Sequence, residues 1–239
     1  MSPAYTYYVF YKPYNVLNQF SKEGPDHVTL ADFINVEKDI YPIGRLDKDS
    51  EGLLILTNDK KLNEALLHPD KKHRRMYVVQ LDGDITDKAI HQAANGVEIK
   101  LAASNYTTKP CSIKKLHKAP VLPERNPPVR YRKEIPTSWA VIELSEGKNR
   151  QVRKMFAKVG FPVLRLVRTQ IENLKLGKLE PGKYYSIEKK ELLQLLNIDY
   201  SKPAKVSSGS KKPNHKLFSQ HKRTNSKHKS GSQSDRKKH

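Results

Sequence analysis

An abrupt change of composition near Tyr200 is the feature that most limits how this chain can fold. Residues 201–239 consist almost entirely of small or polar residues, and Leu217 and Phe218 are their large apolar exceptions. Such a segment cannot bury enough apolar surface to offset the conformational entropy lost on ordering. We therefore predict a folded unit in residues 1–200, followed by a disordered basic tail in residues 201–239.

The net charge of the chain points to a polyanionic partner. Lysine and arginine total 45 against 25 aspartates and glutamates, which gives a formal net charge of +20. The tail holds twelve of these basic residues and a single acid, Asp235, so more than half of the net charge lies there. A surplus of this size is typical of proteins that bind nucleic acid. The alternative is a basic surface that serves solubility alone.

Several classes of protein are disfavoured by residues that the sequence lacks. Cys111 is the single cysteine, which excludes an intrachain disulfide. The nine histidines are scattered and no CxxC or HExxH pattern occurs, which argues against zinc. No signal-peptide pattern opens the chain, and no apolar segment is long enough to span a bilayer. We expect a monomer in a reducing, cytoplasmic compartment, without membrane association or cofactor.

Apolar patterning in residues 5–196 predicts one α+β unit. The predicted strands are rich in β-branched and aromatic residues: Tyr5–Tyr11, Gly52–Thr57, Met76–Leu81, Val97–Leu101, Lys109–Leu116, Trp139–Leu144, Pro162–Val167 and Tyr184–Glu188. The predicted helices begin at capping or polar residues: Thr29–Phe33, Asn58–His68, Thr86–Asn95 and Asn149–Val159. Strands and helices do not alternate regularly, which favours a mixed, mostly antiparallel sheet with flanking helices.

The last of these helices has the clearest amphipathic pattern. Its apolar residues recur at i, i+3, i+4 and i+7, as Val152, Met155, Phe156 and Val159, and Gly160 follows as a stop. Arg153 lies at the border of this apolar face, so it can pack its stem on the core and direct its guanidinium into a cleft. Arg150 lies further round, where we expect it to point to solvent.

The segment Gly44–Gly52 concentrates the candidate chemistry. It places Asp47 on a glycine-bounded loop directly before a fully apolar strand, which would hold the carboxylate rigidly. Arg45 and Lys48 flank Asp47, and neighbouring cations favour the ionised form that a nucleophile or base needs. The alternative is an ordinary acidic turn, in which Asp47 or Asp49 caps backbone amides.

Motifs along the chain resemble those of pseudouridine synthases of the RsuA/RluB/RluE/RluF family. Gly44–Asp47, followed by Ser50–Leu54, resembles the catalytic loop of that family. Phe10–Pro13 resembles its N-terminal Lys-Pro strand, Arg75–Tyr77 its basic-x-Tyr motif, and Gly147–Met155 its C-terminal motif. These separated motifs occur in the family order and cover roughly residues 5 to 190, so their coincidence is specific.

The resemblance implies a fold with a central active-site cleft and a cofactor-free isomerisation of uridine in RNA. Asp47 would attack C1′ of the ribose, or stabilise or deprotonate a glycal-like intermediate. Arg153 would pair with Asp47, Tyr77 would stack on the extruded base, and Arg45 would fill the space of that base or contact phosphate. The alternatives are an arginine that covers core surface, a half-buried strand tyrosine and a surface arginine on a turn.

RNA contacts are expected from the polar side chains of the same motifs, namely Lys12, Arg45, Arg75, Lys148, Asn149 and Arg150. The proline-rich segment Pro123–Trp139 closely resembles RluE-type members of the family, which act on large-subunit ribosomal RNA. Its Arg125, Arg130 and Arg132 suit phosphates and base edges, although a rigid surface linker is the alternative. The chain begins at the catalytic strand, so we expect no N-terminal RNA-binding domain of the kind most relatives carry.

Three other functions remain open at this point. The chain could be a non-catalytic RNA-binding assembly factor, although binding alone does not require the Asp47 carboxylate. It could be a hydrolase in which Asp47 and Asp49 hold Mg²⁺, but the flanking cations make a poor metal site. It could also modify a uridine of small-subunit ribosomal RNA or of transfer RNA.

Overall fold

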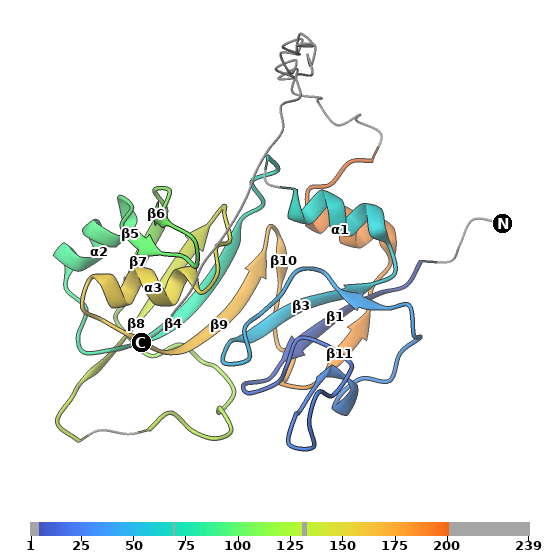
Figure 1. Cartoon of the computed structure of the whole chain (residues 1–239), viewed down its shortest axis with the longest axis horizontal. Helices are drawn as coiled ribbons and strands as arrows, with labels where there is room; N and C mark the ends of the chain where they lie inside the picture. The colour runs from blue at the N-terminus through green and yellow to red at the C-terminus, as the bar shows by residue number, and fades with distance from the viewer. Residues whose placement is uncertain (1–4, 69, 131–132, 201–239) are drawn as a thin grey trace, which may run out of the picture. The chain divides into compact units, whose positions relative to one another are not determined.

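The computed structural model describes residues 5–68, 70–130 and 133–200, within a compact unit that spans Met1–Ser201. The predicted tail, 201–239, and Arg132 lie outside the described residues. The unit is α+β, as predicted (Figure 1). None of the helices described is both long enough and apolar enough to cross a membrane.

A mixed sheet organises the unit, with the strand order β11-β1-β3-β9-β4-β8-β7. Among its described pairs, β3–β9 is parallel and the others are antiparallel, which confirms the predicted sheet type. The strands are β1 (Tyr7–Lys12), β2 (Tyr41–Pro42), β3 (Glu51–Thr57), β4 (Arg75–Asp82), β7 (Ser112–Leu116), β8 (Thr137–Leu144), β9 (Val163–Ile171), β10 (Leu174–Lys175) and β11 (Tyr184–Ser186). A separate hairpin joins β5 (Glu98–Lys100) and β6 (Asn105–Thr107).

Strand β3 is apolar throughout because both of its faces are covered. Leu53 and Ile55 belong to one hydrophobic cluster, and Leu54 and Leu56 belong to another on the opposite face. Strands buried on both faces read as continuous apolar runs rather than as an alternation of apolar and polar residues. The loop that precedes β3 is therefore attached to one of the most deeply buried strands of the fold.

Among the described residues, the sheet is flanked by the helices α1 (Lys60–Leu67), α2 (Asp87–Ala94), α3 (Gln151–Lys158) and α4 (Lys189–Leu195). Helices α1 and α4 contribute Leu62 and Leu192 to the cluster that covers β1 and β3. Helices α2 and α3 contribute Ile90 and Phe156 to the cluster over β4 and β8, and Figure 1 shows these two helices at the left of the view and α1 at the right. Two of the predicted helix starts are confirmed as side-chain caps. Asp59, within the predicted helix Asn58–His68, accepts hydrogen bonds from the first turn of α1, and Thr86 accepts one from that of α2. The helix predicted from Asn149 is instead capped by Arg150, whose side chain makes no capping hydrogen bond.

Some elements were not predicted. Strands β2 and β10 have two residues each, and β6 has three, so they are too short for a periodic pattern. Helix α4 lacks a side-chain cap at Glu188. The helix predicted at Thr29–Phe33 is a 3₁₀ turn, Leu30–Asp32, in which the backbone N–H of Thr29 donates to the Asp32 carboxylate over 2.8 Å.

Gly52 sits where β3 and β9 come together as parallel neighbours. Its φ of +109° lies in a region that L side chains rarely adopt, and a Cβ atom there would approach the carbonyl oxygen of Arg168 to 2.3 Å. Glycine is therefore required for β3 to pair with β9 directly after the loop that carries Asp47.

Candidate active site

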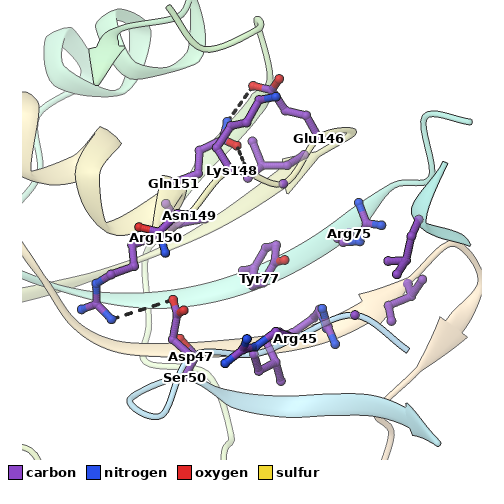
Figure 2. A pocket seen from close by; sticks show the side chains of 18 of the residues that line it. Arg45, Asp47, Ser50, Arg75, Tyr77, Glu146, Lys148, Asn149, Arg150 and Gln151 are labelled. Atoms are coloured by element: carbon purple, nitrogen blue, oxygen red, sulfur yellow. Dashed lines mark hydrogen bonds and ion pairs between the residues drawn. The ribbon is translucent and has the colours of Figure 1, made fainter. Parts of the chain in front are cut away.

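A cleft of about 770 Å³ lies where the Gly44–Ser50 loop, β4, β9 and the segment before α3 meet. Figure 2 shows side chains that enter it from both sides, with Tyr77 on the strand between them. The residues predicted for the site from sequence that line this cleft are Arg45, Asp47, Arg75, Tyr77, Lys148, Asn149 and Arg150. Segments that are far apart in the sequence thus form one cavity, lined by both charged and apolar side chains.

Asp47 occupies a tight turn at the mouth of this cleft. Its carbonyl oxygen accepts a hydrogen bond from the Ser50 amide over 2.9 Å, which closes the turn. Its side chain is 35% exposed, and its Oδ2 lies 3.8 Å from Nη1 of Arg150 (Figure 2). The carboxylate is therefore accessible to a ligand, and a cation faces it.

Both arginines of the C-terminal motif, Arg150 and Arg153, bind Asp49. Arg150 donates to its two side-chain oxygens over 2.9 and 2.7 Å. Nε of Arg153 lies 3.3 Å from its Oδ2, and Nη2 of Arg153 donates to its backbone carbonyl over 2.6 Å. Burial alone would raise the pKa of Asp49, but the Arg150 hydrogen bonds and the Arg153 charge outweigh it and lower that pKa.

The expected pairing of Arg153 with Asp47 is therefore wrong in this structure, in which Asp49 takes that place. Nη1 of Arg153 donates to the Val163 carbonyl over 3.0 Å, so the side chain ties the loop to α3 and to the start of β9. Burial lowers the pKa of Arg153 below the usual arginine value, while Asp49 opposes that shift.

Arg150 is exposed, as expected, with 42% of its side chain accessible, but it also lines the cleft. Arg150 is the residue that caps α3, and it has a left-handed backbone with φ 52° and ψ 33°. Helical periodicity no longer sets the direction of a side chain at such a position. The guanidinium reaches into the cleft, where Asp49 raises its pKa.

Lys12 lies beneath the Asp47 loop rather than in the cleft. Its side chain is fully buried, and its ammonium donates to the carbonyls of Pro13 and Lys48 over 2.9 and 3.3 Å. Burial lowers the pKa of Lys12 to about 7, against the pull of Glu51, Asp49 and Asp47. This position gives the prediction that Lys12 contacts RNA no support, because the group supports the loop from inside.

The floor of the cleft contains an arginine that sequence reasoning missed. Tyr77, on β4, is aligned with Arg168 on β9, and Arg168 is in turn aligned with Gly52 on β3. All three strands meet here, and Arg168 is only 4% exposed. No local pattern marks this residue in the sequence, because Arg168 reaches the cleft only through the pairing of β9 with β3 and β4.

The wall opposite the loop is a polar network centred on Glu146. Its carboxylate accepts hydrogen bonds from Tyr106, from the Lys109 amide and from Gln151, over 2.6, 2.9 and 2.7 Å. The ammonium of Lys148 lies 4.7 Å from the centre of the Tyr106 ring. This network fixes the backbone of the Gly147–Arg150 segment. The side chains of Lys148 and Asn149 extend from this segment and line the cleft (Figure 2).

Arg125 and Arg130, the described arginines of the proline-rich segment, are not among the residues that line this cleft. The guanidinium of Arg125 donates to the carbonyls of Pro127, Pro128 and Leu164, over 2.8, 3.0 and 3.2 Å, and covers the Tyr14 ring at 4.1 Å. These bonds hold the segment on the fold, so the geometry supports a structural role for Arg125 rather than RNA contact. Arg130 lines a separate pocket of about 220 Å³.

The two loop carboxylates do not form the metal site of the hydrolase alternative. Asp49 is occupied by two guanidiniums, which repel a cation from the same position. Within the residues that the structure describes, no group of three or more histidine, cysteine, aspartate or glutamate side chains is arranged to hold a metal ion.

The sheet topology and the Asp47–Tyr77 cleft define the class of this protein, which the comparisons with known proteins establish. The family model described as RNA pseudouridylate synthase matches residues 6–158. The chain belongs to this family, and it is an RNA pseudouridine synthase. A solved structure titled as that of a pseudouridylate synthase superposes with a TM-score of 0.65 at 23% identity, over 80% of this chain and 74% of that one, and shares the fold.

Relatives of known name narrow the comparison further. Ribosomal large subunit pseudouridine synthase E of Vibrio parahaemolyticus is 46% identical over 75% of this chain and 73% of its own. The protein of the same name from Xanthomonas campestris is 43% identical over 72% and 90%. The dual-specificity RNA pseudouridine synthase RluF of Salmonella typhi is 34% identical over 78% and 56%.

Proposed function

We propose that this enzyme isomerises a uridine of large-subunit ribosomal RNA to pseudouridine without a cofactor, and that Asp47 is its catalytic carboxylate. The observation that carries the proposal is the position of Asp47 at the mouth of the cleft, accessible and faced by Arg150. The names of the relatives at 43–46% identity support the substrate.

The reaction exchanges one bond of the base for another. The C1′–N1 bond breaks, the uracil turns, and a new bond joins C1′ to C5. The proton on C5 is lost and N1 gains one, so the product has the composition of the substrate. Asp47 contributes either as nucleophile at C1′ or as the base that takes the C2′ proton.

The other residues of the cleft then have distinct roles. The ring of Tyr77 stacks on the base after it leaves its helix or loop. Arg150 and Arg153 act through Asp49 and keep the Asp47 turn in place. Arg45, Arg75, Lys148 and Asn149 line the same cleft, where they contact phosphates and base edges of the RNA.

The proposal includes the setting of the enzyme, a monomer in the cytoplasm. Size-exclusion chromatography with light scattering tests the oligomeric state, and cell fractionation tests the compartment. A dimeric mass in dilute solution would contradict the first part.

Mapping pseudouridine in host ribosomal and transfer RNA, with and without the gene, tests the substrate. One site in large-subunit ribosomal RNA should disappear on deletion and return with the wild-type gene but not with an Asp47→Asn gene. Because the RluF relative is named as a dual-specificity enzyme, the same mapping should also look for a second modified RNA. Activity of the purified enzyme should persist in EDTA, and loss of activity there would favour the metal-dependent hydrolase instead.

A further inference from the structure

A buried arginine without an anionic partner lies at the floor of the cleft. Arg168 is 4% exposed, and its Nη2 atom makes no hydrogen bond with the described residues. Its Nε donates to the Leu53 carbonyl over 2.8 Å, and no carboxylate in the described ranges lies within ion-pair distance of it. Burial lowers the pKa of this guanidinium, and interaction with the Tyr77 hydroxyl opposes that shift.

Arg165, three residues earlier on β9, is a buried arginine that does have an anionic partner, and it serves as a comparison for Arg168. It is 7% exposed and makes two hydrogen bonds to the Glu51 carboxylate, over 2.9 and 2.8 Å. A paired and buried charge of this kind stabilises its surroundings only while both partners are present. Arg168 has comparable burial without such compensation, and an uncompensated buried cation is destabilising.

The surroundings of Arg168 place this cation beneath the expected position of the uracil. Arg168 lines the cleft together with Tyr77, its cross-strand neighbour. Its other neighbour is Gly52, which has no side chain to separate it from the Asp47 loop. The guanidinium of Arg75 lines the same part of the cleft, and Nη2 of Arg75 donates to the Leu66 carbonyl over 3.1 Å.

The proposed reaction generates negative charge on the base in this position. When the C1′–N1 bond breaks, its electron pair leaves with the uracil, and the charge spreads over N1, O2 and O4. C1′ receives a pair in exchange, either from the Asp47 carboxylate or from the C2′–H bond, whose proton goes to Asp47. When C5 of the uracil anion bonds to C1′, the C1′–O bond to Asp47 breaks and returns the carboxylate, or, on the glycal route, Asp47 returns its proton to C2′. Transfer of the proton from C5 to N1 then gives neutral pseudouridine.

We infer that Arg168 is a charge-stabilising residue of this enzyme, a fixed cation that lowers the energy of the detached uracil anion. The inference rests on the proposed function. A preorganised cation in a water-poor site interacts more strongly with charge that develops during the reaction than a solvated one does. The stability lost by leaving Arg168 unpaired in the free enzyme is offset when the anion forms.

The test compares Arg168→Met, Arg168→Lys and the matched control Arg165→Met. Arg168→Met should lower the single-turnover rate by about 10²-fold while RNA affinity stays near wild type. The unfolding temperature should stay at the wild-type value or rise, because the variant removes an unpaired buried cation. Arg168→Lys should recover part of the rate, because it keeps the charge. Arg165→Met should lower the unfolding temperature, because it leaves Glu51 buried and unpaired.

A substrate with a better leaving group separates charge stabilisation from a structural role. Fluorine at C5 stabilises the uracil anion, so consumption of 5-fluorouridine in the RNA should depend less on Arg168, at a pH where N3 stays protonated. The loss caused by Arg168→Met should be at least about tenfold smaller on this substrate than on uridine. Equal losses on both substrates, or a rate at wild-type level, would overturn the inference.

The wild type serves as the control for the proposed function itself. If it forms no pseudouridine in any of the RNAs, the proposed function fails and this inference fails with it. If the wild type is active and the variants of Arg168 behave like it, the inference alone fails.

Discussion

The guanidinium of Arg150 holds the Asp49 carboxylate through two hydrogen bonds, across 101 residues of sequence, while its Nη1 lies 3.8 Å from Asp47. One side chain thus joins the cap of α3 to the Asp47 loop. Because Arg150 contacts both carboxylates, it sets the position of the loop and the charge around Asp47 at the same time.

We expect Arg150→Gln to lower turnover by about 10²-fold, because a displacement of roughly 1 Å in a catalytic group has an effect of that size. Stability should change by less than about 1 kcal/mol, because the ion pair is partly exposed. Single-turnover kinetics and urea denaturation measure the two effects. A rate near that of the wild type would show that the Asp47 turn holds its position without Arg150.

Asp47→Asn should abolish isomerisation while RNA affinity stays nearly intact. The side chain keeps its size but loses the charge needed for attack or proton transfer, and we expect a loss of at least about 10³-fold. Pseudouridine formation on large-subunit ribosomal RNA fragments is the measurement. Asp26→Asn, at an exposed carboxylate, is the matched control. Residual turnover near wild type in Asp47→Asn would remove Asp47 from the mechanism.

Arg153→Met should lower activity strongly while the protein stays folded. Methionine keeps the apolar contact of the stem but loses the bonds to the Asp49 and Val163 carbonyls. We expect about 10²-fold slower turnover and a loss of roughly 1–3 kcal/mol in the free energy of unfolding. Thermal denaturation and single-turnover kinetics on the same sample distinguish a role in activity from a structural one. Gross unfolding of the variant would favour a purely structural role for Arg153.

Lys12 should give the enzyme a pH-dependent stability. Its pKa is about 7 in the folded protein, against 10.5 as the ordinary value. Between these values the unfolded chain holds a proton that the folded protein has lost, so stability rises with pH across this window. Relative to Lys12→Met, the wild type should gain on the order of 1 kcal/mol per pH unit above pH ~7.

Urea denaturation between pH ~7 and ~9 measures this difference, over a range that lies inside the titration window. Lys60→Met, at an exposed lysine, should show no such divergence from the wild type. Parallel curves for the wild type and Lys12→Met would mean that Lys12 keeps an ordinary pKa.

Deletion of residues 201–239 should weaken RNA binding without removing catalysis. Each phosphate neutralised contributes about −0.7 to the slope of log affinity against log salt for single strands. If about four tail cations engage RNA, truncation should flatten that slope by roughly 3 units, with turnover at saturating RNA unchanged. An unchanged slope would assign the tail to another partner or to solubility, and lost turnover would place an essential group within it.

The sequence by itself predicted the strands and helices that carry periodic patterns or caps. The run Gly52–Thr57 predicted β3, and the apolar spacing from Val152 to Val159 predicted α3, because both signals depend on neighbours within a few residues. The motif around Asp47 likewise marked the loop of the candidate site before any contact was known. Such local signals do not report which distant side chains meet.

The tertiary structure alone decided the partners inside the cleft. Arg153 faces Asp49 rather than Asp47, and Arg150 turns into the site because its backbone is left-handed at the start of α3. The burial of Lys12 and Arg168 follows from the pairing of β1 and β9 with β3, strands that lie far apart in the chain. Burial and charge pairing are properties of the assembled sheet, so no stretch of the sequence read alone could assign them.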